Sequence, residues 1–331
     1  DVTGTTTLAA GSSNDITLSN ASNNFATVVI TSGRNVTLVD AGTIDLGAST
    51  VSGTYAVTAT SGGGITDSGV LEISGTSTLT AAGGQSIILD QSSTFGTVAF
   101  VASSGNLKNV TINDSNAFDL SALTLAKVSS AGGNLTVTAG GAVTNSDTLV
   151  IPGTATISAS SQAVTLNDSS NDFGTVTITG ANVAVTDTNA IILGASTVSG
   201  TYSVTADGNI TDDGALVITE LTTLAAGSGI ITLDHTSNDF QGGLIISSSG
   251  NVVLRDVGAI DLGAATVSGT YSVTAGGAIT DSGTQEIAGV TTLAAGSSND
   301  ITLDISTNNF ASAVVITSGR NVAITDEHTI V

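Results

Sequence analysis

Aspartates recur at the ends of short apolar segments along the whole chain. The repeated motif is a β-branched residue, a threonine, an apolar residue and an acid, as in Ile301-Thr302-Leu303-Asp304. If these segments are strands stacked about 4.8 Å apart, the acids line one corner of the stack. The predicted column consists of Asp187, Asp212, Asp234, Asp256, Asp281, Asp304 and Asp326.

Such a column suggests calcium binding. Neighbouring carboxylates about 4.8 Å apart repel each other by about 0.9 kcal/mol in water, and a shared Ca²⁺ would offset that repulsion. The alternative is that each aspartate accepts hydrogen bonds from its own turn and faces solvent. The sequence lacks the Gly-Gly-x-Gly-x-Asp repeat of calcium-loaded β-rolls, which favours the alternative. We therefore expect no cofactor and keep calcium as a second hypothesis.

Two histidines and one arginine lie beside these acids. His235 and His328 are about four coils, hence about 20 Å, apart, so they cannot share a metal ion or form a catalytic pair. Arg255, next to Asp256, is the one base in the kind of acidic surrounding that a polysaccharide lyase needs. No long loop accompanies it to form a cleft. The sequence therefore predicts no enzyme activity.

The charge balance limits the partners. The chain of 331 residues has 27 acids against five bases, for a net charge of −22. The bases are Arg34, Lys108, Lys127, Arg255 and Arg320. Binding to nucleic acid or to an anionic membrane needs clustered cations, so neither is an expected partner. Arg34 and Arg320 share the slot Thr-Ser-Gly-Arg-Asn, which predicts a repeated structural role for them.

Composition also limits the fold. Glycine is abundant (40 residues), proline occurs once, and cysteine and methionine are absent. This mixture favours strands and tight turns, and it excludes disulfides and thiolate metal sites. No apolar run approaches about 20 residues, so we expect no membrane insertion. Residues 5–36 reappear nearly unchanged at 290–322, which predicts a segment of a longer repeat protein.

The spacing of the acidic motif predicts a solenoid. Twelve intervals separate Asp40 from Asp326, which gives about 24 residues per coil and about 14 coils. Thr-Leu-Ala-Ala-Gly and its variants mark a module of about 70 residues, or about three coils. Because three short strands fit one coil and parallel crossovers wind right-handed, we predict an all-β, right-handed parallel β-helix. We expect one continuous solenoid over 1–331, with modules at 5–75, 76–153, 154–220, 221–289 and 290–331 (incomplete) and extra residues at 103–105 and 129–132.

Alternation within the coils predicts which side chains face inward. Tyr55, Tyr202 and Tyr271 occupy one slot of the repeat, and Leu135 replaces them in the second module. The slot is therefore apolar and inward, with no need for a phenol hydroxyl. One phenylalanine per module is predicted to plug a corner, with an extra copy at Phe118. These are Phe25, Phe95, Phe173, Phe240 and Phe310.

The modules at 193–218 and 291–326 resemble the repeat regions of filamentous-haemagglutinin-like exoproteins, the two-partner-secreted bacterial adhesins. The resemblance covers essentially the whole chain and lies in the style of the repeat. It implies a non-catalytic β-helix shaft outside the cell, at the bacterial surface, that carries an adhesive tip or builds a fibre or sheath. Because an uncapped coil can pair with another chain, we expect as partners adjoining repeats or further copies stacked end to end, with surface glycans as another ligand.

Threonine runs support an alternative function. Segments such as Thr175-Val176-Thr177 resemble the flat threonine arrays of ice-binding solenoids. Here threonine alternates with alanine, serine and glycine, so no face is uniformly threonine. Carbohydrate or ice binding is therefore the second hypothesis, and a polysaccharide lyase is the least favoured.

Overall fold

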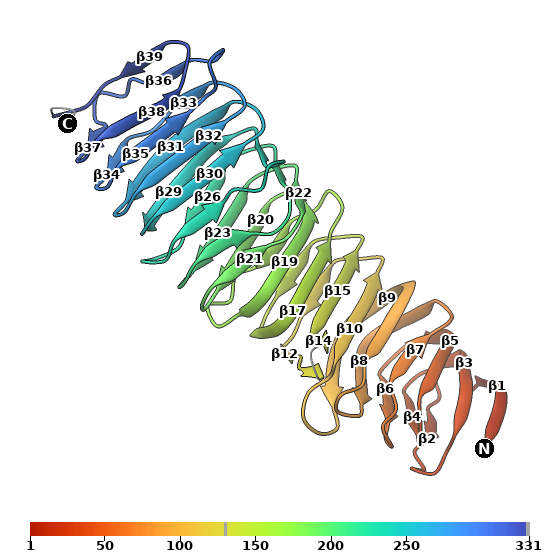
Figure 1. Cartoon of the computed structure of the whole chain (residues 1–331). Coiled ribbons are helices and arrows are strands. Elements are labelled where there is room, and N and C mark those ends of the chain that lie inside the picture. The colour runs from red at the N-terminus through yellow and green to blue at the C-terminus, as the bar shows by residue number, and fades with distance from the viewer. Residues whose placement is uncertain (129–130, 329–331) are drawn as a thin grey trace. The chain divides into compact units, whose positions relative to one another are not determined.

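A computed structural model describes residues 1–128 and 131–328. These residues contain strands, turns and bends but no helix, and therefore none that is long and apolar enough to cross a membrane. The chain divides into two compact units, residues 1–162 and 163–331. Each unit is a stack of short strands (Figure 1).

The strands of the first unit are β1 (Val2–Ala9), β2 (Ile16–Leu18), β3 (Phe25–Gly33), β4 (Val36–Asp40), β5 (Ile44–Val51), β6 (Tyr55–Ala59), β7 (Ile65–Asp67), β8 (Leu71–Ala81), β9 (Ile87–Ala102), β10 (Asn109–Asp114), β11 (Phe118–Leu120), β12 (Leu123–Thr124), β13 (Lys127–Val128), β14 (Ala131–Gly132), β15 (Asn134–Ala139), β16 (Val143–Asn145) and β17 (Leu149–Ser158). The strands of the second unit are β18 (Val164–Leu166), β19 (Asp172–Gly180), β20 (Val183–Asp187), β21 (Ile191–Leu193), β22 (Ser196–Val198), β23 (Tyr202–Ala206), β24 (Ile210–Asp212), β25 (Leu216–Ile218), β26 (Thr222–Ala225), β27 (Ile231–Leu233), β28 (Asp239–Phe240), β29 (Gly243–Ser249), β30 (Val252–Asp256), β31 (Ile260–Val267), β32 (Tyr271–Ala275), β33 (Ile279–Asp281), β34 (Gln285–Ile287), β35 (Thr291–Ala294), β36 (Ile301–Leu303), β37 (Asn309–Phe310), β38 (Val314–Ser318) and β39 (Val322–Ile324).

Successive coils are joined by parallel backbone pairing. Partner residues are between 17 positions apart, as for Thr175 and Ile192, and 26 positions apart, as for Leu123 and Leu149. The strands of each coil therefore form backbone hydrogen bonds with the strands of the neighbouring coil. The predicted all-β parallel solenoid is confirmed, and its right-handed winding stays a prediction.

In the second module, the described residues on either side of residues 129–130 of the predicted insertion pair with each other. In the described part of the chain, β13 and β14 form the one antiparallel pairing, which joins Lys127 to Gly132. An insertion at a turn leaves the stacked strands undisturbed on either side. Ser129 and Ser130 of the predicted insertion lie outside the described residues.

The coils are shorter than the acidic motif predicted. The solenoid has about 15 turns of about 21 residues, in place of the predicted 14 turns of 24. A module of about 70 residues therefore spans about three and a third coils, and the prediction of three was wrong. Each module carries three strand ends of this motif, with an aspartate or an asparagine, in these three and a third coils, so counting the motif overestimates the coil length.

Because a module is not a whole number of coils, each repeated position falls on a different face of the stack in the next module. In the second unit, three successive pairings lead from Tyr202 through Thr222 and Leu244 to Leu262, nine residues short of Tyr271. The tyrosine slots of consecutive modules are therefore not stacked on one another. For the same reason the phenylalanines of successive modules lie in different sheets, with Phe240 beside Ile218 in one and Phe310 beside Ile287 in the other.

Inward-facing side chains form the core as predicted. Ile301 and Leu303 are buried, whereas Asp304 is exposed. The six phenylalanines singled out from the sequence are all buried. Phe118 is not an extra copy of the phenylalanine slot, however. It pairs with Val143 and occupies the position of Ile44 at the start of β5 and of Ile260 at the start of β31.

The tyrosine slot faces inward as predicted, but burying the phenol hydroxyl there lowers the stability of the fold. Each tyrosine pairs with a hydroxyl residue of the next coil, and all six hydroxyl groups are buried without a hydrogen bond of normal length and angle. The pairs are Tyr55 with Ser77, Tyr202 with Thr222 and Tyr271 with Thr291. In the second module the paired residues are Leu135 and Ala155, so both polar groups are replaced together.

Replacing Tyr271 by phenylalanine is expected to stabilise the fold by about 1 to 2 kcal/mol, because a buried hydroxyl without a partner costs about that much. Burial raises the pKa of Tyr271, and no neighbouring side chain opposes the shift. Burial also raises the pKa of Tyr55, but there the Ser49 hydroxyl offsets part of the effect. Urea unfolding of Tyr271→Phe and Tyr55→Phe measures this, with the smaller gain expected for Tyr55→Phe. A loss of stability in Tyr271→Phe would contradict the account.

Candidate functional site

One class of aspartate is buried at the end of a strand and binds two backbone N–H groups. Asp187 accepts a hydrogen bond from Phe173 N at its Oδ2 (2.6 Å) and one from Asn189 N at its Oδ1 (2.8 Å). The same pair of contacts is made by the buried Asp40 and Asp256 and by Asp326, which is half-buried and follows β39. Burial raises the pKa of Asp187, although both N–H groups lower it. These carboxylates connect the phenylalanine corner of one segment to the turn of the next.

A second class is half-buried and accepts hydrogen bonds from the following coil. Asp281 Oδ1 accepts from Asp304 N (3.0 Å), and its Oδ2 accepts from Asn308 Nδ2 (2.7 Å). One module earlier, Asp212 accepts the equivalent hydrogen bonds from Asp234 N and Asn238 Nδ2. Asp234 and Asp304 themselves are exposed. Three kinds of environment thus arise from one sequence motif.

The seven predicted acids do not form one column. Backbone pairing places Asp187 beside Ala206, Asp212 beside Leu193 and Asp256 beside Ala275. The cause is the module length. Each module is about a third of a coil longer than three whole coils, so equivalent acids of successive modules lie on different faces. Two pairs do meet through a backbone N–H, namely Asp212 with Asp234 and Asp281 with Asp304. Among residues 1–128 and 131–328, no three histidine or acidic side chains form a group that could hold a metal ion.

Asparagines at another corner bind the following coil and were missed in the sequence. Asn35 Oδ1 accepts from Thr54 N at 3.0 Å, and a β-carbon on Gly53 would lie 2.4 Å from that oxygen. Asn182 and Asn251 make the same contact. The signal was present in the sequence, because an asparagine precedes a valine in this slot and a Ser-Gly-Thr-Tyr segment follows.

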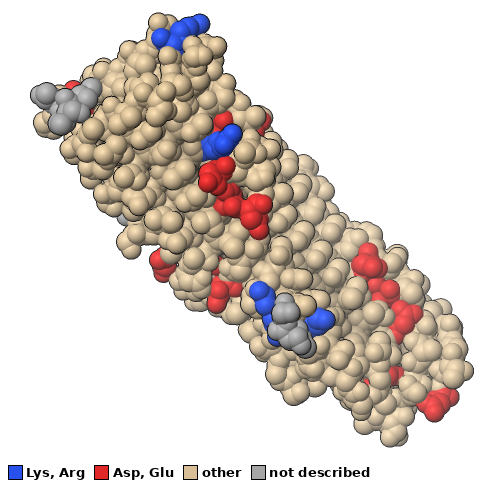
Figure 2. Space-filling view, in the orientation of Figure 1, with Lys and Arg blue, Asp and Glu red and all other residues tan. Residues whose placement is uncertain are grey.

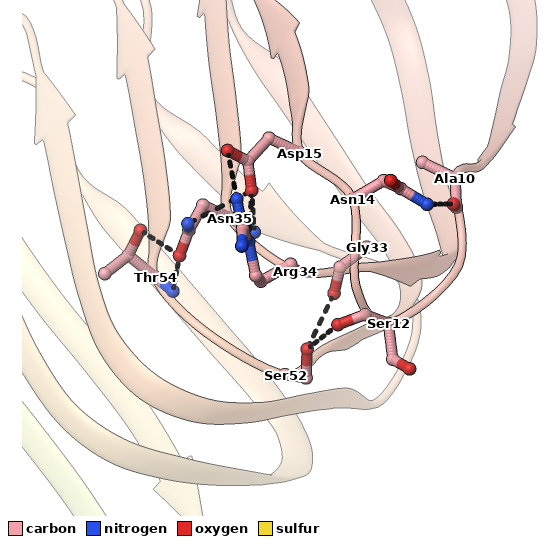
Figure 3. A network of polar contacts seen from close by, with 9 residues as sticks. All are labelled: Ala10, Ser12, Asn14, Asp15, Gly33, Arg34, Asn35, Ser52 and Thr54. Atoms are coloured by element: carbon pink, nitrogen blue, oxygen red, sulfur yellow. Dashed lines mark hydrogen bonds and ion pairs between the residues drawn. The ribbon is translucent and has the colours of Figure 1, made fainter.

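Two of these corners also carry an ion pair. Asp15 accepts from Arg34 Nε (2.8 Å) and Nη2 (3.0 Å), and from the backbone and side chain of Asn35 (Figure 3). Arg320 and Asp300 repeat this arrangement. In the other modules neither the acid nor the arginine is present, so the two occur together or not at all. The arginines thus have the repeated structural contact that their shared slot predicted.

Removal of the Arg34 guanidinium should be visible in the titration of its partner. The hydrogen bond from Arg34 is the largest cause that lowers the pKa of Asp15 to about 2. In Arg34→Ala we expect the Asp15 pKa to rise toward the ordinary value of about 3.8. Carboxyl-detected NMR titration measures this, and Arg255→Ala is the control that removes the same charge elsewhere. An unchanged Asp15 pKa would show that the pair does not form in solution.

The remaining candidates do not gather into a site. His235 Nδ1 accepts from Ser237 N (3.2 Å), and His328 N donates to Asp326 Oδ1 (2.7 Å), so each histidine belongs to its own turn. Arg255 lies outward on β30, beside Thr274. Its neighbour Asp256 is turned inward to the backbone.

Acidic side chains gather in short rows on the face shown in Figure 2, with few basic ones among them. In the first unit, burial raises the pKa of Asp67 to about 6, and the neighbouring carboxylates of Asp90 and Asp45 add repulsion. Asp67 also accepts hydrogen bonds from Asp90 N and Gln91 N, which oppose the shift.

The free energy of unfolding is expected to rise as the pH falls from 7 to 5. The folded state holds the Asp67 proton more tightly than the unfolded chain, so stability increases as pH falls through 6 toward 4 and is lost as pH rises through 6. Thermal unfolding against pH measures the slope. Asp67→Asn should flatten it, whereas Asp147→Asn, the same charge change at an exposed site, should leave it nearly unchanged. A slope of opposite sign would contradict the assignment.

Coil-to-coil pairing, inward apolar side chains and corner amides and carboxylates together define a parallel β-solenoid repeat protein. Five consecutive stretches match one repeat family, described as repeats of unknown function (DUF5649): residues 1–32, 33–102, 107–179, 180–247 and 249–317. The chain therefore belongs to this family. No curated protein and no solved structure matches it.

Proposed function

We propose that this chain is a non-catalytic structural segment that adds length to a larger assembly. The observation that carries the proposal is the use of the polar side chains. Carboxylates and amides at the corners, such as Asp187 and Asn182, bind backbone N–H groups of adjoining segments instead of converging on a cleft. Such an arrangement can be repeated without limit, because each coil needs only its neighbours.

The proposed place of this segment is the bacterial cell surface, in the shaft of a large adhesin or in a fibre or sheath. The likeness of its modules to filamentous-haemagglutinin-like repeats supports this placement. The proposed partners are adjoining repeats or further copies of the chain, because the strand edges of a terminal coil can pair with another coil.

Two measurements test the proposal. Antibodies against the chain should label intact cells that produce it as strongly as permeabilised cells, and labelling confined to permeabilised cells would contradict the surface location. Negative-stain microscopy of the purified chain distinguishes the two structural roles. Filaments that grow with protein concentration favour a fibre, whereas isolated particles at all concentrations favour a shaft segment.

One observation favours the alternative of carbohydrate or ice binding. Thr111, Thr136 and Thr156 are register partners on consecutive coils of the first unit, and all three point outward. The column is interrupted one coil earlier, where Ile88 takes the place of threonine. Thermal hysteresis and glycan-array binding test this function. Loss of either activity in Thr136→Asp, with retained folding, would support it.

A further inference from the structure

Two grooves open at equivalent positions of the first and second units. In the first unit, Val29, Ala48, Thr50 and Glu72 line a groove of about 360 Å³. In the second unit the groove measures about 450 Å³ and has Ile245, Ala264, Thr266 and Glu286 in the same places. A further hollow of about 270 Å³ continues from Thr266 and Glu286 toward the next coil.

A β-bulge produces each groove. Between β29 and β31, Leu244 pairs with Leu262 but Ile246 pairs with Ala265, so β31 has one extra residue at this point. The extra residue bends the strand away from its neighbour. A β-carbon on Gly263 would lie 2.9 Å from Ile245 Cγ1, so the glycine allows the bulge to pass close beneath the groove wall.

Each groove contains one carboxylate that no cation neutralises. Glu286 pairs in register with Thr266, and Glu72 pairs with Thr50, whose hydroxyl lies 3.4 Å from Glu72 Oε2. Both glutamates are exposed. The ion pairs found among the described residues are those of Arg34 and Arg320, and neither involves these glutamates.

The other complete modules serve as internal comparisons. In the third module the equivalent register pair is Thr197 with Val217, and in the second it is Thr124 with Val150. The threonine is present in all four modules, so the bulged strand does not require the glutamate. The acid is therefore an addition to the groove in the first and fourth modules.

We propose that the Glu72 and Glu286 grooves each bind a lysine side chain of an extended segment from a partner protein. The aliphatic walls suit a lysine stem, and an ammonium group can donate to both the carboxylate and the threonine hydroxyl. No aromatic ring lines either groove, so the stacking surface that favours a guanidinium is absent from these linings. The chain itself has two lysines against 27 acids, which makes another protein the source of the cation.

The test is calorimetric titration of the full chain with an acetylated and amidated Ala-Lys-Ala-Lys-Ala peptide. We expect two sites in the natural chain, and at least a fivefold weaker interaction when norleucine replaces lysine. Glu286→Gln should reduce the number of sites to one, and Glu72→Gln combined with it should abolish binding. The control Glu220→Gln removes the same charge at an exposed position outside the grooves and should leave both sites intact.

The third module allows a gain of function. Val217→Glu places a carboxylate beside Thr197 and should raise the number of sites from two to three. If Glu220→Gln weakens binding as much as Glu286→Gln, the peptide is attracted by the net charge alone and the proposal is overturned. An unchanged number of sites in Val217→Glu, with retained folding, also overturns it. The proposal does not depend on the cellular location of the chain.

Discussion

Replacing Asp187 by alanine is expected to lower the free energy of unfolding by about 2 to 4 kcal/mol. Its carboxylate satisfies Phe173 N in the buried corner and Asn189 N at the partly exposed turn, and both N–H groups would lose their acceptor. Each buried donor left unpaired costs about 1 to 3 kcal/mol, and relief from burying the carboxylate offsets part of that loss. Urea unfolding measures the change, and hydrogen exchange should show faster exchange at both amides.

Asp304→Ala is the matched control, because Asp304 ends a strand of the same motif but is exposed. Its substitution should change stability by less than about 0.5 kcal/mol. Equal effects of the two substitutions would mean that the buried corner contact contributes nothing specific. The comparison therefore separates an aspartate that holds two segments together from one that only ends a turn.

Gly283→Ala is expected to destabilise the second unit by about 3 kcal/mol, because a β-carbon there would overlap backbone atoms of the previous coil. It would lie 2.3 Å from Ala264 N and 2.8 Å from Ala264 Cα. The equivalent glycines of other modules, Gly69 and Gly214, face the same position of the bulged strand at 2.1 Å and 2.3 Å. Backbone cannot move aside as a flexible side chain does, so the coil spacing itself must open. Thermal and urea unfolding measure the loss.

Gly4→Ala provides the comparison, because no heavy atom lies within 4 Å of the β-carbon it would add. We expect a change of less than about 0.5 kcal/mol for it. A neutral result for Gly283→Ala would show that the coils are spaced more widely at this corner. Gly283 also lies next to the bulge that forms the Glu286 groove, so peptide binding should weaken in Gly283→Ala.

Much of the fold follows from local sequence pattern. Alternation in segments such as Ile301-Thr302-Leu303 identified strands and their inward face, since a strand with one buried face must alternate. The recurrence of the motif identified a solenoid, since equivalent strands at a regular period stack on one another. The inward position of Tyr55 followed from the leucine that replaces it in another module. These inferences need only short-range periodicity.

The roles of individual polar residues depended on the tertiary structure. Asp187, Asp281 and Asp304 end similar motifs, yet one is buried, one half-buried and one exposed. The difference comes from the segment that lies beside each acid, which is about 14 to 27 residues away and is set by the coil length. An error of about three residues per coil in the sequence analysis was enough to merge these three environments into one predicted column.

The sequence by itself therefore determined the parallel stacking, the inward face of each strand and the repeated structural role of Arg34 and Arg320. The tertiary structure alone decided which face each module presents, because three and a third coils per module is a property of the whole winding. It also decided that Glu72 and Glu286 lie beside a bulge. A bulge depends on how two neighbouring strands pair, and no single strand sequence contains that information.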